Sequence, residues 1–175
     1  MKPVVLGLAV ALAVAAGVTD WRSRRIPNWL TVPGLLLGIA ANAAAGGWSG
    51  LKTSLLGAGL GLALLLPLAV VKGIGMGDLK FAGAAGSFLG PDRLLTVLIG
   101  SVFVNGLMAL VLAIYKGRLR ETLRNIGKML TALAHLRLPG PEFSLDNPST
   151  LKVPYGVALA LTMVLYAIAW ARGAV

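Results

Sequence analysis

Two aspartates stand out in a chain that has few charged residues. Asp20 follows an apolar run over residues 3–19, and Asp78 lies in the glycine-rich segment 73–80 (GIGMGDLK) between two further apolar runs. An ionisable side chain where a chain enters a bilayer costs free energy, so each aspartate is a candidate functional residue. Two carboxylates brought close together in a partly dry site resist ionising together and share one proton. The pair therefore predicts acid–base chemistry.

Such a pair can hydrolyse an amide bond. The ionised member takes a proton from water as the water attacks a carbonyl, and the protonated member hydrogen-bonds the carbonyl oxygen and later assists the leaving amine. This aspartic-peptidase arrangement needs no metal, cofactor or covalent intermediate. Gly75 and Gly77 would shape the site by allowing a substrate backbone to approach closely. Lys80 is either a charge that fixes membrane topology or a group that orients or ionises Asp78.

The positions of the two aspartates suggest how they divide these roles. Asp20 ends one predicted helix and Asp78 begins another. The helix macrodipole disfavours an anion at a C-terminus and favours one at an N-terminus. Asp20 is therefore predicted to hold the shared proton more often, and Asp78 to act as the base.

Composition indicates a membrane protein that positions these residues on helices. The 175 residues are 57% hydrophobic and 13% charged, against roughly 25% charged in soluble domains. Several runs approach the ~20 apolar residues that cross a bilayer. We expect an all-α, polytopic bundle of about six transmembrane helices that forms a single domain over residues 1–175. The predicted spans are residues 3–19, 29–46, 51–71, 79–89 (short for a crossing), 94–115 and a last run that ends at Trp170.

The remaining composition excludes several kinds of site. The chain has no cysteine, which rules out disulfides, thiolate metal sites and a cysteine nucleophile. The single histidine, His135, has no second histidine with which to bind a metal. The net charge of +10 does not indicate nucleic-acid binding, because the basic residues lie in short loops beside apolar runs rather than on a soluble module.

A segment with a different pattern interrupts the apolar runs at residues 116–137. Leucines and an isoleucine recur there at helical spacing, with four basic residues between them (Leu119, Leu123, Ile126, Leu130, Leu133; Arg118, Arg120, Arg124, Lys128). This pattern is typical of an amphipathic helix that lies on anionic membrane lipids. A proline-containing loop follows over residues 138–150, so residues 116–150 are predicted to lie in the cytoplasm.

The basic residues also predict the orientation of the chain. With six crossings, twelve of the lysines and arginines fall on one side, which the positive-inside rule assigns to the cytoplasm. Asp20 and Asp78 then both lie at the cytoplasmic face. An alternative interpretation of residues 1–19 as a cleaved signal peptide would leave Arg22, Arg24 and Arg25 unexplained.

These residues resemble those of a known family. Gly75-Met-Gly-Asp78 with Lys80 is similar to the Gly-x-Gly-Asp motif of type IV prepilin peptidases. Asp20 followed by Ile26-Pro-Asn28 and Leu30-Thr31 is similar to the first aspartate motif of that family, and Pro154-Tyr-Gly156 to a segment before its last span.

The resemblance implies an aspartic endopeptidase of the bacterial inner membrane. Such enzymes remove the short basic leader of prepilins and pseudopilins after a glycine at the cytoplasmic face, and Asp20 and Asp78 match their catalytic pair. The sequence departs from larger members in lacking their paired-cysteine insert and methyltransferase region, so N-methylation is not expected. This short form is similar to peptidases that serve Flp-type (tight-adherence) pili, with archaeal preflagellin peptidases as a neighbouring group.

Two functions of other classes stay open. A small transporter that carries protons or cations on the two aspartates would have inverted repeats and carboxylates near the bilayer midplane. A non-enzymatic membrane subunit of a pilus or secretion assembly would tolerate asparagine at both positions.

Overall fold

The computed structural model describes residues 2–134 and 153–174, and every regular element in them is an α-helix. The helices are α1 (Pro3–Ser23), α2 (Asn28–Val70), α3 (Met76–Leu89), α4 (Pro91–Tyr115), α5 (Leu119–Ala134) and α6 (Tyr155–Ala171). Among these residues, α1, α2 and α4 are long and apolar enough to cross a membrane, and α6 is apolar but shorter. The all-α prediction is confirmed, while the count of six crossings stays a prediction.

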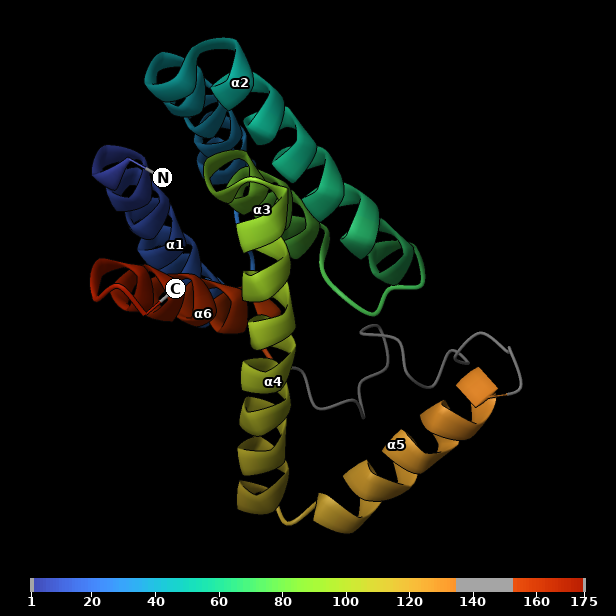
Figure 1. Cartoon of the computed structure of the whole chain (residues 1–175). Helices are drawn as coiled ribbons and strands as arrows, with labels where there is room; N and C mark the ends of the chain where they lie inside the picture. Colours follow the sequence, from blue (N-terminus) through green and yellow to red (C-terminus); the bar gives the residue numbers. More distant parts are fainter. Residues whose placement is uncertain (1, 135–152, 175) are drawn as a thin grey trace.

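Helix α2 is a hairpin rather than one straight rod. Its backbone leaves the helical conformation at Gly47, where φ is +57° and ψ is −138°, values that favour glycine. The two arms diverge from this bend (Figure 1). They correspond to the predicted spans 29–46 and 51–71 and to the loop predicted between them.

Helix α3 is enclosed by the rest of the bundle. Leu79 and residues 81–89 are all buried, and the main neighbour of α3 is α2 (Figure 1). The contact consists of small residues: a Cβ added to Gly57 would collide with the backbone of Gly86, and one added to Gly61 would lie 2.5 Å from the carbonyl oxygen of Ala82. These small residues allow the two helix backbones to approach closely.

The C-terminal end of α3 shows how a short helix can end inside an apolar bundle. With 14 residues, α3 is about 21 Å long at 1.5 Å per residue. Its last carbonyl groups have no partners within the helix. The side chain of Asn42 donates to the carbonyl oxygens of Ser87 and Phe88 at 2.7 and 3.0 Å, and the Ser54 hydroxyl donates to that of Ser87 at 2.6 Å. Residues of α2 therefore satisfy the polar groups at this end.

Helix α6 packs against both α1 and α4. A Cβ added to Gly17 of α1 would lie 3.0 Å from the Cβ of Ala160, so these two helices approach closely. On the other side, the hydroxyls of Tyr155 and Ser101 form a hydrogen bond of 2.9 Å between α6 and α4. Through these contacts the N-terminus of α6 is held beside the C-terminal end of α1.

The predicted amphipathic helix is present as α5. Within the described residues α5 packs against α4 and lies apart from the other helices (Figure 1). An ion pair of 2.7 Å between Arg118 and Glu121 forms at its start. The predictions for His135 and for the loop of residues 138–150 lie outside the described residues.

Candidate active site

Asp20 lies in the last turn of α1, with its side chain directed into the protein. It is 5% exposed. Arg24 ends the helix in the left-handed conformation and donates its backbone N–H to the carbonyl oxygen of Asp20 at 2.8 Å. The backbone N–H of Val157, in the first turn of α6, donates to Asp20 Oδ2 at 3.1 Å. An ionised carboxylate is the best acceptor for such a bond.

Asp78 lies in the first turn of α3, beyond the three helices that are long enough to span a membrane. The backbone N–H of Gly75 donates to Asp78 Oδ2 at 3.2 Å, so the carboxylate caps the helix that carries it. Burial raises the pKa of Asp78 from 3.8 to about 6, and the negative charge of Asp20 contributes to the increase. Asp78 thus retains a proton at a higher pH than an exposed aspartate does.

Gly156 lies between the two carboxyl groups. A Cβ added there would lie 2.8 Å from Asp20 Oδ2 and 3.0 Å from Asp78 Oδ1. The two oxygens are no farther apart than the sum of these distances, so one water molecule can hydrogen-bond to both. The structure thus brings the predicted pair together, and any side chain at residue 156 would enter the space between them.

A cavity of about 260 Å³ opens beside the two aspartates. Its lining combines the carboxylates with the two backbone turns that precede α2 and α3. The lining residues are Asp20, Arg24, Arg25, Ile26, Gly75, Met76, Gly77 and Asp78. The cavity offers two carboxyl groups and space for water. In the described part of the chain, no group of three or more His, Cys, Asp or Glu side chains is placed to hold a metal ion.

The three other predicted site residues have different positions. Gly75 and Gly77 line the cavity, and a Cβ added to Gly77 would lie 3.0 Å from the carbonyl oxygen of Ile26. Lys80 is not part of the lining; its ammonium group donates to Asn28 Oδ1 at 2.9 Å. Lys80 thus links the start of α3 to the start of α2 from outside the cavity.

Sequence reasoning did not identify Gly156 as part of the site. Only the family resemblance distinguishes the Pro154-Tyr-Gly156 segment in the sequence. Its contact with Asp20 spans 136 positions of the chain, and no periodicity or charge pattern in the sequence indicates such a contact.

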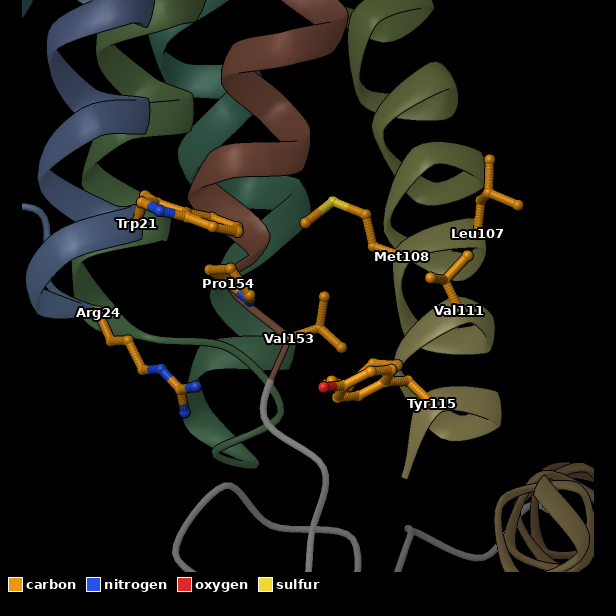
Figure 2. Close-up of a pocket in the computed structure, with 9 residues that line it drawn as sticks. Trp21, Arg24, Leu107, Met108, Val111, Tyr115, Val153 and Pro154 are labelled. Atoms are coloured by element: carbon orange, nitrogen blue, oxygen red, sulfur yellow. The ribbon is translucent and has the colours of Figure 1, made fainter. Parts of the chain in front are cut away.

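A larger apolar groove also reaches Arg24. It has a volume of about 550 Å³ and runs between the end of α1, the C-terminal half of α4 and the segment before α6 (Figure 2). Its lining residues are Trp21, Arg24, Leu107, Met108, Val111, Leu112, Tyr115, Val153 and Pro154. Arg24 is common to the groove and to the cavity beside the aspartates.

Known proteins match about two thirds of this chain. A prepilin leader peptidase/N-methyltransferase of Burkholderia pseudomallei strain 1026b is 33% identical over 121 residues, which cover 65% of this chain and 38% of that protein. A protein of the same name from Neisseria gonorrhoeae is 30% identical over 118 residues, which cover 63% of this chain and 41% of that protein. The matches thus span about two fifths of these relatives. No solved structure matches the chain.

The family comparison confirms the resemblance seen in the two aspartate motifs. Residues 7–112, which are more than half of the chain and include both aspartates, match the type IV leader peptidase family (Peptidase_A24). The chain therefore belongs to the type IV leader peptidase family.

Proposed function

We propose that this protein is a membrane aspartic endopeptidase that removes the leader peptide of type IV prepilins and pseudopilins. The observation that carries the proposal is the convergence of Asp20 and Asp78 on Gly156, at a cavity that both carboxylates line. A buried acid with a raised pKa beside a second carboxylate is a common feature of catalytic sites. Membership of the leader peptidase family favours a peptide substrate.

The proposed reaction is hydrolysis of one peptide bond. Water between the carboxylates attacks the scissile carbonyl carbon, and the ionised aspartate takes one proton from that water. The protonated aspartate donates a hydrogen bond to the carbonyl oxygen, which becomes the hydroxyl of the tetrahedral intermediate. The C–N bond then breaks, and a proton from the pair goes to the leaving amine.

The structural contacts support a division of roles opposite to the one expected from helix ends alone. Asp20 accepts the N–H of Val157 at the start of α6, a donor that the macrodipole argument did not include. Asp78 also accepts a backbone N–H, that of Gly75, but burial raises its pKa to about 6, and in this proposal it carries the shared proton more often. In this proposal Asp20 is the base that activates water and Asp78 is the acid, with the proton shared by the coupled pair.

The cellular setting is part of the same proposal. The bias of lysine and arginine toward one set of loops supports a multi-pass protein of the bacterial inner membrane, with both aspartates at the cytoplasmic face. The basic face of α5 supports binding to anionic lipids there. The resemblance favours Flp-type prepilins with a short basic leader as substrates.

Asparagine variants test the proposal. Wild type, Asp20→Asn, Asp78→Asn and the control Asp92→Asn are placed in membranes with a tagged Flp-type prepilin, and loss of the leader is followed by mass. Asp92 is in the first turn of α4 and does not line the cavity. We expect cleavage by wild type and the control, and a loss of at least about 100-fold in each of the other two.

The alternatives give different results. If both cavity variants cleave as fast as wild type, the aspartates are structural and the proposed mechanism fails. If wild type does not cleave, the transporter and the non-enzymatic subunit are the functions to test next. A proton flux that either asparagine abolishes would then identify the transporter.

A further inference from the structure

The first turn of α6 supplies the backbone that surrounds the two carboxyl groups. The N–H groups that open a helix have no partner within it. That of Val157 donates to Asp20 Oδ2 at 3.1 Å, and Gly156 lies against both carboxyl groups. The geometry of the two aspartates therefore depends on where this turn lies.

A hydrogen bond between two hydroxyl groups ties this turn to α4. Tyr155, the first residue of α6, is 2.9 Å from the hydroxyl of Ser101. Ser101 is fully buried, and its hydroxyl donates to the carbonyl oxygen of Leu98 at 2.7 Å. A serine hydroxyl has one proton to donate. The tyrosine hydroxyl is therefore the donor in the bond between the two helices, and the serine oxygen is the acceptor.

The rest of α6 is held by packing that does not involve this bond. Helix α6 packs against α1 and α4 (Figure 1). On the α1 side, Gly17 approaches Ala160. On the α4 side, a Cβ added to Gly100 would lie 2.7 Å from Cγ2 of Thr162. Both contacts lie more than one turn beyond Tyr155, so loss of its hydroxyl should leave the helix in place and free only the first turn.

We propose that Tyr155 is a positioning residue for the hydrolysis. Through its bond to Ser101 it fixes the first turn of α6, and it thereby holds the N–H of Val157 on Asp20. This inference rests on the proposed function. A base that activates water needs an ionised and correctly oriented carboxylate, and an N–H donor favours the ionised form. Tyr155 thus acts through Asp20 rather than through contact with the substrate.

Removal of single hydroxyl groups tests the assignment. Tyr155→Phe keeps the ring and removes only the donor, and Ser101→Ala removes the acceptor. The control Tyr166→Phe makes the same change near the other end of α6. Wild type, these three variants and the double variant Ser101→Ala/Tyr155→Phe are assayed for leader removal from the tagged Flp-type prepilin, with kcat and KM measured over a range of pH.

We expect Tyr155→Phe to lower kcat about tenfold, because a small displacement of a catalytic group is costly, while KM changes less than about twofold. Ser101→Ala should have the same effect. The double variant should be no slower than either single one, since the two hydroxyls act only through each other. Tyr166→Phe should match wild type. The midpoint of thermal unfolding of Tyr155→Phe should fall by no more than about 4 °C, since one hydrogen bond is lost.

The pH dependence separates positioning from a general loss of folded protein. A carboxylate with a weaker N–H donor is protonated more easily, so the acidic limb of the kcat profile should move to higher pH in Tyr155→Phe. The other ionisable groups that line the cavity with Asp20 are unchanged in this variant: Asp78 on α3, and Arg24 and Arg25 just after α1. The phenol that is removed ionises near pH ~10, far from this limb.

The remaining outcomes would overturn the inference. If Tyr155→Phe has the same kcat and the same acidic limb as Tyr166→Phe, the inference is wrong and the peptidase function is unaffected. A fall in kcat with no shift of the limb would indicate lost folded protein, and a rise in KM at unchanged kcat would indicate contact with the substrate; either refutes positioning. If Ser101→Ala is as fast as wild type, the bond between the hydroxyls does not position the turn. A wild-type protein that cleaves nothing would refute the proposed function, and this inference with it.

Discussion

Replacing Asp78 with asparagine should make the protein more stable at neutral pH while abolishing its activity. The ordinary pKa of the aspartate is 3.8, and burial raises it to about 6 in the folded protein. The folded state therefore holds this proton more tightly than the unfolded state does. Stability from the protonated acid is complete below pH 3.8 and is lost as the pH rises through about 6.

The size of the effect follows from the two pKa values. One pKa unit corresponds to about 1.4 kcal/mol, so ionised Asp78 costs about 3 kcal/mol of folding free energy at pH 7.5 and above. At pH 4 the cost falls below about 1 kcal/mol, because the acid is then mostly protonated in both states. Asparagine has the same shape, carries no charge, and can still accept the N–H of Gly75.

Thermal unfolding of the purified protein in detergent measures this difference. At pH 7.5 we expect the midpoint for Asp78→Asn to exceed that of wild type by roughly 6–12 °C, given about 2–4 °C per kcal/mol for a chain of this length. At pH 4 the two midpoints should nearly coincide. The control Asp92→Asn should follow wild type at both pH values.

Two results would refute the reasoning. If Asp78→Asn is no more stable than wild type at pH 7.5, the ionised carboxylate does not destabilise the folded state. If the variant is more stable by the same amount at both pH values, the gain does not come from ionisation, and the protonated role proposed for Asp78 loses its support.

Two further predictions concern glycines that a Cβ would disturb. Gly156→Ala places a methyl group between the two carboxylates, and we expect kcat for leader removal to fall about 100-fold through their displacement; an unchanged kcat would show that the close approach is not needed. Gly57→Ala, where the added Cβ meets the backbone of Gly86, should cost about 1–3 kcal/mol of unfolding free energy. Gly59→Ala, which meets nothing within 4 Å, should instead leave stability unchanged or raise it by up to about 1 kcal/mol; equal effects of the two would contradict the tight α2–α3 contact.

The sequence predicts the parts of this fold that lipid and local backbone determine. Apolar runs separated by residues 46–50 predict the two arms of α2, because a glycine-rich break of this length allows a reversal of direction. The periodic leucines after residue 116 predict α5 for a similarly local reason. The two aspartates were expected at one membrane face from charge counts alone, and the structure places them at one cavity.

Contacts between distant segments could not be predicted in this way. A hydropathy pattern does not show which helices pack together. It therefore cannot predict that the side chains of Asn42 and Ser54 donate hydrogen bonds to a carbonyl group at the end of α3. Nor does it place Gly156 between the carboxylates or pair Lys80 with Asn28. The proposed division of proton roles depends on such contacts, since the backbone donor to Asp20 belongs to the distant helix α6.

The enclosure of α3 has a consequence for how the protein responds to its host membrane. Bilayers differ in thickness by a few Å, and helices that touch lipid adjust to the difference by tilting. Asp78 is carried by a helix whose residues beyond Lys80 are all buried, whereas Asp20 is carried by α1, where Val4, Val14 and Val18 are exposed. A change in lipid chain length therefore acts directly on the helix that carries Asp20 and only through neighbouring helices on the one that carries Asp78, so we expect the alignment of the two carboxylates to be sensitive to the bilayer.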